Sequence, residues 1–200
     1  MITRTTTRLL DELCAPGNER VWEEFDARYR PILEGVARKL GFGDEEAAEI
    51  TQESLTTFLQ AFRAGRYDRS KGRLSSWLVG ITRNTAMAIC RRGVIGGKHK
   101  AGGDTLVAGV PDEAQLTLIW DEQCEREVLR AAMAQLRATS RTDERTFLAF
   151  ELVALRGATA EAAAQACGMS VAEVYVAKNR MTRRLKETIT LLREAYREDG

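Results

Sequence analysis

Residues 44–62 read DEEAAEITQESLTTFLQAF, and this stretch predicts an amphipathic helix. Apolar side chains recur in it every three or four residues, the spacing that places them on one face of a helix. Asp44 is a residue type that caps helix N-termini. The buried face is expected to carry Ala47, Ile50, Leu55, Phe58, Leu59 and Phe62, and the opposite face Glu45, Glu49, Gln52, Glu53, Thr56 and Gln60.

Helices of the same kind are predicted on both sides of this stretch. Upstream, an apolar stripe follows the expected cap residue Asn18 and contains Pro31, which should kink the helix. Downstream, Ser75 or Ser76 is expected to cap a third helix. The upstream stripe consists of Trp22, Phe25, Tyr29, Ile32, Val36 and Leu40, and the downstream helix turns Trp77, Leu78, Ile81 and Ile89 inward. Before Trp22, the leucines Leu9, Leu10 and Leu13 fit either a short capping helix or a partner site.

The second half of the chain begins with a break in this pattern. From residue 93 the periodicity fades into Gly-rich sequence containing Pro111, which predicts a flexible linker over 93–119. Helical spacing returns over 121–137, with Trp120, Cys124, Val128 and Ala131 on one face. A further helix is expected after a cap at Ser140 or Thr142, with Phe147, Phe150 and Ala154 inside and Gly157 at its end. No segment alternates with a period of two, so the predicted fold class is all-α, with two small helical domains at 1–92 and 120–200.

Residues 159–185 read as a short helix, a tight turn and a longer helix. The small residues Ala163 and Ala164 would let two helices cross closely, and Gly168 suits a turn with positive φ. Ser170 would cap the longer helix, which is expected to bury Val174, Ala177, Met181 and Leu185. This layout is typical of a helix-turn-helix, whose second helix enters the major groove of DNA. A plain helical hairpin is the alternative.

Charge is segregated along the chain, although 30 Lys and Arg nearly balance 29 Asp and Glu. Residues 62–103 hold ten bases and one acid, and residues 178–186 hold five bases and no acid. Residues 44–53 hold five acids and no base. This distribution favours two surfaces for a polyanion and one surface for a different partner.

The reactive residue types do not form a recognisable catalytic or metal site. The four cysteines lie far apart in the sequence, whereas zinc ligands usually come in close pairs. His99 is the single histidine and lies in a loop-like Gly–Lys segment. We therefore expect no catalytic residues, no metal and no cofactor, and hence no enzyme. No stretch approaches the roughly 20 apolar residues of a membrane span, and the N-terminus lacks the apolar run of a signal peptide, so a cytoplasmic location is expected.

Two strings carry a resemblance to a known family. Glu49-Ile50-Thr51-Gln52-Glu53 is followed by Ser76-Trp77-Leu78-Val79-Gly80-Ile81-Thr82-Arg83-Asn84 and then Arg91-Arg92. Together they resemble region two of bacterial RNA polymerase sigma factors, in which an acidic helix precedes a Trp-Leu-x-x-Ile-x-x-Asn helix ending in Arg-Arg. The downstream helix-turn-helix pattern is similar to region four. The order of region two, linker and region four is similar to the extracytoplasmic-function class.

The resemblance implies a subunit that binds core RNA polymerase, recognises promoter DNA and melts the minus-ten element, and it allows an anti-sigma factor as a further partner. It implies that Glu49, Gln52 and Glu53 bind polymerase. The implied minus-ten DNA-binding residues are Arg63, Arg66, Tyr67, Lys71, Arg73, Arg83, Asn84, Arg91 and Arg92. The implied minus-thirty-five DNA-binding residues are Ser170, Val171, Ala172, Glu173, Tyr175, Lys178, Asn179, Arg180, Arg183 and Arg184. The side chain of Trp77 is expected to pack in the core and not to stack on a base.

Two other function classes remain for comparison. A free-standing helix-turn-helix regulator would bind duplex DNA without polymerase, but it leaves the acidic helix and the basic loop without a role. An all-helical enzyme would need clustered acid and base groups, and the nearest pair, Glu49 and Glu53, lies on an expected exposed face without a histidine.

Overall fold

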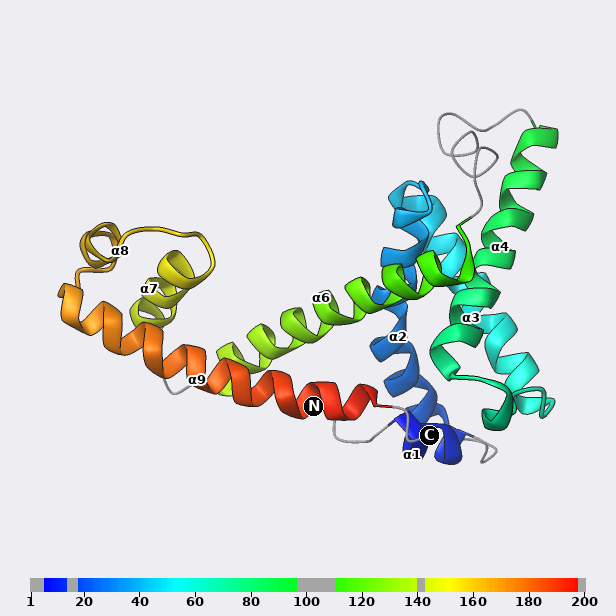
Figure 1. Cartoon of the computed structure of the whole chain (residues 1–200), viewed down its shortest axis with the longest axis horizontal. Helices are drawn as coiled ribbons and strands as arrows, with labels where there is room; N and C mark the ends of the chain where they lie inside the picture. The colour runs from blue at the N-terminus through cyan, green and yellow to red at the C-terminus, as the bar shows by residue number, and fades with distance from the viewer. Residues whose placement is uncertain (1–5, 14–17, 97–110, 140–142, 198–200) are drawn as a thin grey trace. The chain divides into compact units, whose positions relative to one another are not determined.

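The computed structural model describes residues 6–13, 18–96, 111–139 and 143–197. These ranges are helical and contain no strand, which confirms the all-α prediction. The helices are α1 (Thr6–Leu13), α2 (Glu19–Lys39), α3 (Asp44–Arg63), the short 3-10 helix η1 (Arg69–Lys71), α4 (Leu74–Gly96), α6 (Glu113–Thr139), α7 (Glu144–Ala154), α8 (Ala160–Cys167) and α9 (Val171–Tyr196) (Figure 1). Among the described residues, no helix combines the length and apolar character needed to cross a bilayer.

The helices belong to two compact units. The first contains α1 to α4 and α6 as far as Glu127, and the second extends from Val128 to Ala195. The division therefore falls inside α6 and not at residue 120. Helices also extend into both ends of the segment expected as a linker, because α4 continues to Gly96 and α6 begins at Glu113.

The core of the first unit is built from the apolar faces of α2, α3 and α4. Phe25 of α2 stacks on Phe58 of α3 with ring centroids 4.6 Å apart and an interplanar angle of 3°. Leu116 and Trp120 of α6 add to the same core. The apolar stripes expected in α2 and α3 are confirmed, except that Trp22 and Leu59 are half-buried; in α4, Leu78 and Ile89 are buried while Trp77 and Ile81 are half-buried.

The N-terminal segment forms a helix that packs on this core. Leu9, Leu10 and Leu13 of α1 are each at most 3% exposed, and Thr6 Oγ1 shares a buried 2.9 Å hydrogen bond with the hydroxyl of Tyr29 on α2. Of the two alternatives for this segment, the capping helix is the one that the structure supports. Buried leucines cannot at the same time present an apolar face to a partner.

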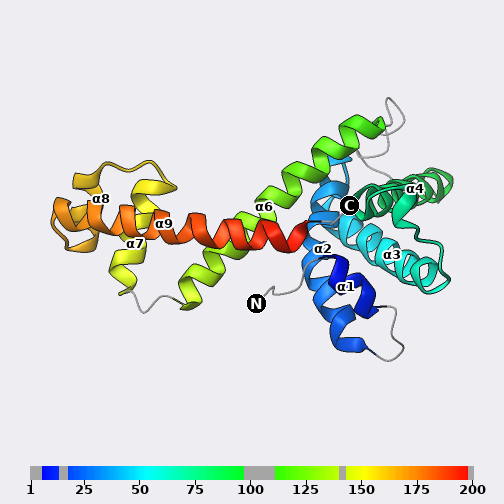
Figure 2. The same ribbon diagram turned by 60° about the horizontal axis from the view of Figure 1, so that its bottom comes forward.

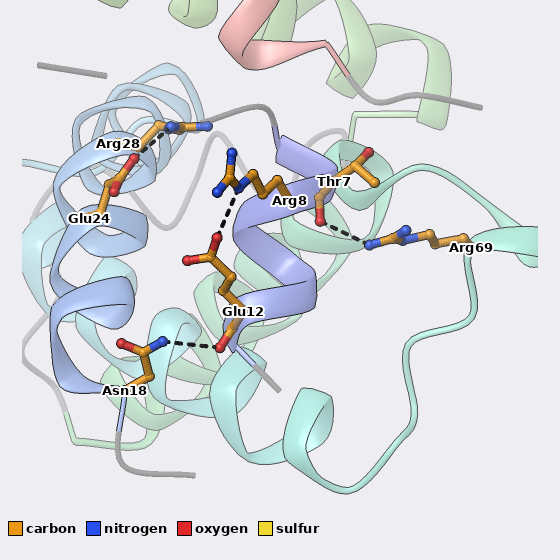
Figure 3. A network of polar contacts seen from close by, with 7 residues as sticks. All are labelled: Thr7, Arg8, Glu12, Asn18, Glu24, Arg28 and Arg69. Atoms are coloured by element: carbon orange, nitrogen blue, oxygen red, sulfur yellow. Dashed lines mark hydrogen bonds and ion pairs between the residues drawn. The ribbon is translucent and has the colours of Figure 1, made fainter. Parts of the chain in front are cut away.

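Four expected helix caps differ in the structure. Ser75 and Ser76 lie inside α4, which begins at Leu74, so neither residue is its cap. Asn18 precedes α2, but its side chain donates to the carbonyl oxygen of Glu12 at the end of α1 instead of capping (Figure 3). Gly43 occupies the N-cap position of α3, and its N–H donates to Glu46 Oε2, so Asp44 is the first helical residue. Asp143 caps α7 by accepting from the N–H of Arg145. The expected caps Ser140 and Thr142 lie outside the described residues.

Pro31 of α2 and Ala154 of α7 are expected inside helices. The helix α2 continues through Pro31, which lies inside it and does not end it. In α7, Phe147 and Phe150 are buried as expected, but Ala154 is exposed and Ala149 is buried in its place. Ala149 lies one helical turn from Arg145 and faces α8, whereas Ala154 is the last residue of its helix.

In the second unit, α7, α8 and the first turns of α9 lie together (Figures 1 and 2). Ala149 of α7, Ala163 and Ala164 of α8, and Val174 of α9 form one buried cluster. Gly168 follows α8 with φ of +61°, a left-handed conformation that glycine adopts without strain. Both the alanine crossing and the glycine turn are confirmed.

Candidate functional surfaces

The acidic face of α3 is exposed along most of its length. Glu49 and Gln52 are exposed, while Glu53 is half-buried. The Gln52 side-chain oxygen accepts a 2.9 Å hydrogen bond from Arg30 of α2. Glu49 and Gln52 are thus the accessible members of the three residues expected to bind polymerase. The three lie on one helix face because Gln52 and Glu53 follow Glu49 by three and four residues.

Glu53 makes a contact that the sequence does not reveal. Arg92 Nη2 on α4 lies 3.1 Å from Glu53 Oε1 and 3.0 Å from Oε2. One residue expected to bind polymerase is therefore ion-paired with one expected to bind DNA. The acidic face of α3 and the C-terminal half of α4 consequently adjoin each other.

A basic loop joins α3 to α4 and is organised around Asp68. The Asp68 carboxylate accepts from the hydroxyl and the N–H of Ser70, and Lys71 Nζ lies 3.5 Å away. The hydrogen bond from the Ser70 hydroxyl, together with that from the Ser70 N–H and the charge of Lys71, lowers the pKa of Asp68 below its usual value. The expected DNA-binding residues of this loop that are exposed are Arg63, Arg66, Lys71 and Arg73.

A hollow of about 260 Å³ opens in this loop and has an aromatic wall. Tyr67 stacks on Trp77 with ring centroids 5.0 Å apart and an interplanar angle of 14°. Trp77 in turn meets Phe58 of the core edge-on at 5.3 Å. Arg66, Lys71 and Arg73 also line the hollow. Trp77 therefore both packs on the core and borders the hollow.

The remaining residues expected to contact minus-ten DNA lie on α4. Asn84, Arg91 and Arg92 are exposed, and Arg83 is half-buried with its Nε atom buried and without a hydrogen-bond partner. Arg83 and Arg73 line a second hollow, of about 310 Å³, whose other wall consists of Pro111, Asp112 and the beginning of α6 as far as Asp121.

The beginning of α6 is a part of this surface that sequence analysis missed. Asp112 Oδ1 accepts from the N–H of Gln115, and Gln115 Oε1 accepts from the N–H of Asp112. This reciprocal pair is a capping box, and the spacing Asp112-x-x-Gln115 is the signal that could have located the helix. The neighbouring glycines and Pro111 concealed it.

The α8–α9 turn carries a second capping box. Ser170 Oγ accepts from the N–H of Glu173, while Glu173 Oε2 accepts from the N–H and the hydroxyl of Ser170 at 2.7 and 2.8 Å. The expected Ser170 cap is confirmed. The hydrogen bonds from the Ser170 N–H and hydroxyl lower the pKa of Glu173. Glu173 thus has a structural role in addition to the base contact expected of it.

The expected minus-thirty-five residues share the outer face of α9. Val174, Ala177, Met181 and Leu185 are buried on the inner face, as expected. The residues that are exposed are Ser170, Val171, Ala172, Glu173, Tyr175, Asn179, Arg180, Arg183 and Arg184, and Lys178 is half-buried. Tyr175 is 50% exposed, a large side chain available to a partner.

Comparison with known proteins gives one family match. Residues 25–93, which include α3, the basic loop and most of α4, match the Sigma-70 region 2 family model. No curated protein matches the chain. Among solved structures, that of CnrH in complex with the cytosolic domain of CnrY is similar, with 18% sequence identity, 91% of this chain and 95% of that chain covered, and a TM-score of 0.35. The match of residues 25–93 to Sigma-70 region 2 supports a sigma factor with a role in transcription initiation.

Proposed function

We propose that this chain is a sigma factor of the extracytoplasmic-function class, which binds core RNA polymerase, recognises promoter DNA and melts the minus-ten element. One observation carries the proposal. The segment that matches Sigma-70 region 2 is the same segment that bears the exposed acidic face of α3 and the basic loop with its aromatic hollow. In this proposal the polymerase supplies the catalytic chemistry, and the chain supplies docking and recognition.

The loop between α3 and α4 has the chemistry needed to hold an unpaired strand. Bases separated from their partners stack on aromatic side chains, an interaction of about 1–3 kcal/mol per base. The stacked Tyr67 and Trp77 offer such a wall, and Arg66 and Arg73 beside it can neutralise phosphates. A hollow of about 260 Å³ is open to a flipped base.

The outer face of α9 suits duplex DNA. Lys178, Arg180, Arg183 and Arg184 supply cations for phosphates, which position a protein without specifying sequence. Asn179 can form two hydrogen bonds with adenine in the major groove. Glu173 Oε2 already accepts two hydrogen bonds from Ser170. Glu173 can therefore accept from cytosine N4 only through the hydrogen-bonding capacity that these bonds leave unused.

The proposal is tested by binding of the full chain to purified bacterial core RNA polymerase. The key variant is Glu49→Ala with Gln52→Ala, which removes two exposed polar side chains of the acidic face. The matched control is Glu19→Ala with Glu23→Ala, two exposed acids that belong to α2 and not to that face. Stoichiometric binding that only the key variant loses supports the proposal.

The opposite result identifies the alternative. If the folded wild-type chain does not bind core polymerase but binds duplex DNA tightly by itself, it is a free-standing regulator. That alternative uses α8 and α9 but gives the acidic face of α3 no role.

A further inference from the structure

The N-terminal helix contacts the basic loop directly. Arg69, the first residue of η1, donates from Nη2 to Asp11 Oδ1 at 2.8 Å and to the carbonyl oxygen of Thr7 at 3.2 Å. Both acceptors belong to α1 and lie about sixty residues earlier in the chain. Figure 3 shows Arg69 extending from the loop toward Thr7 on α1.

The helix that carries these acceptors is held against the core. The three buried leucines of α1 and the hydrogen bond between Thr6 and Tyr29 fix this helix against α2. Thr7 and Asp11 are four residues apart and therefore lie on one side of α1. A guanidinium has several N–H donors in a fixed plane, so one Arg69 side chain can engage both acceptors.

The donor lies in the middle of the segment that lines the aromatic hollow. Tyr67 and Asp68 precede Arg69, and Lys71 to Arg73 follow it, and all of these line the hollow. Arg69 itself does not line it. Its side chain extends to α1 while its neighbours border the hollow. Fixing Arg69 thus restricts the path of the loop on both sides of that hollow.

We propose that the contact of Arg69 with Asp11 and Thr7 positions the basic loop for capture of single-stranded DNA, which makes α1 part of the recognition apparatus. This inference rests on the proposed function. Arg69 and Asp11 act as positioning residues, because they set the geometry of Tyr67 and its neighbours and need not touch DNA themselves.

The test compares Asp11→Ala, Arg69→Ala, the double variant and the exchanged pair Asp11→Arg with Arg69→Asp. The matched control is Glu12→Ala, which removes an acid of the same helix that pairs with Arg8. Each full chain is assembled with core RNA polymerase and titrated against a fluorescein-labelled single-stranded DNA of randomised sequence. Core binding and the free energy of unfolding are measured in parallel.

We expect both single variants to weaken single-strand binding by about two- to fivefold, the range of a partly exposed ion pair. The double variant should be no weaker than either single variant, and the exchanged pair should recover most of the binding. Core binding should not change, and Glu12→Ala should behave as wild type.

Three results would contradict the positioning role of Arg69 and Asp11. If Arg69→Ala weakens binding while Asp11→Ala does not, Arg69 contacts DNA directly and the positioning role is wrong. If Asp11→Ala strengthens binding, Asp11 only repels DNA, which also overturns the inference. A wild-type chain that does not bind core polymerase overturns the proposed function and this inference with it.

Discussion

Arg92 of α4 is ion-paired with both carboxylate oxygens of Glu53 of α3, at 3.0 and 3.1 Å. The family resemblance assigns the two residues to different partners, Glu53 to polymerase and Arg92 to promoter DNA. Because the two side chains pair with each other, polymerase would meet a Glu53 that is already bound to Arg92. DNA would likewise meet an Arg92 that is already bound to Glu53. The arginine and carboxylate side chains are 61% and 41% exposed, so solvent screens the pair.

This pairing predicts that the two residues can be separated by mutation. We expect Arg92→Ala to weaken single-stranded DNA binding, because one fewer phosphate is neutralised, and to leave core polymerase binding unchanged. We expect Glu53→Ala to weaken polymerase binding and to leave Arg92 more available to DNA. Either change should lower the free energy of unfolding by less than about 1 kcal/mol.

Fluorescence anisotropy with labelled DNA and with labelled core polymerase measures the two affinities. Arg20→Ala, which removes an exposed base of α2, is the control and should alter neither. If both variants lost both affinities, the ion pair would have a structural role for the whole surface, and the two residues would not bind separate partners.

The local features of this fold could be predicted from the sequence, and the long-range contacts could not. The apolar stripes of α2, α3 and α9 and the Ser170 cap depend on spacing within one helix, which the sequence displays directly. The partners of Arg69 lie 58 and 62 residues away, and that of Arg92 lies 39 residues away. No periodicity encodes such distances. The beginning of α6 was missed for a different reason, since Gly and Pro residues around it outweighed its capping box.

The α9 capping box predicts a separation between helix stability and base recognition. Ser170→Ala should lower the stability of the second unit by about 1 kcal/mol, because the N–H of Glu173 loses its acceptor. Glu173→Gln should cost less stability, since glutamine can still accept from the Ser170 N–H although it lacks the charge. Hydrogen exchange of the α8 and α9 amides measures the stability, and binding of a duplex library measures recognition. Equal stability loss in the two variants would show that the cap needs the charge.

The lowered pKa of Glu173 predicts a pH dependence of the same cap. A carboxyl group whose pKa is lower in the folded state stabilises the fold fully above its unfolded pKa. This stabilisation is lost over the window that runs from the usual glutamate pKa of about 4.3 down through the lower folded value. The advantage of wild type over Glu173→Gln should therefore shrink in that window and be constant above it. Glu161→Gln on α8 is the control, and hydrogen exchange at a series of pH values is the measurement.

The stacked wall of the hollow predicts that the ring of Tyr67 matters more than its hydroxyl for single-strand capture. Tyr67→Ala removes the stacking surface beside Trp77 and should weaken binding by about 1–3 kcal/mol. Tyr67→Phe keeps the ring and should retain most of the affinity. The titration of the assembled complex with single-stranded DNA checks both variants. If Tyr67→Phe and Tyr67→Ala lost the same amount of affinity for single-stranded DNA, recognition would depend on the Tyr67 hydroxyl.

The packing of α6 on α2 predicts that Gly35→Ala lowers stability in the wild-type chain and raises it when Gln123 is replaced by alanine. Gly35 of α2 faces Gln123 of α6 so closely that an added methyl group would lie 2.8 Å from Gln123 Cδ and 2.9 Å from Cγ. Gln123 is buried, so its side chain has little room to move. Overpacking of this kind costs about 1–3 kcal/mol, which exceeds the gain of at most about 1 kcal/mol in helix propensity from Gly to Ala. Gly35→Ala should therefore destabilise the first unit.

In a Gln123→Ala background the same change should be stabilising, because the clash is gone and the gain in helix propensity remains. Gln123→Ala itself should cost little hydrogen bonding, since Gln123 Nε2 is buried without a partner. The control is Gly80→Ala in α4, where an added methyl group meets nothing within 4 Å and should stabilise in either background. Urea unfolding followed by tryptophan fluorescence measures the first unit, because Trp22, Trp77 and Trp120 all belong to it. A destabilising Gly35→Ala in both backgrounds would place the clash elsewhere than at Gln123.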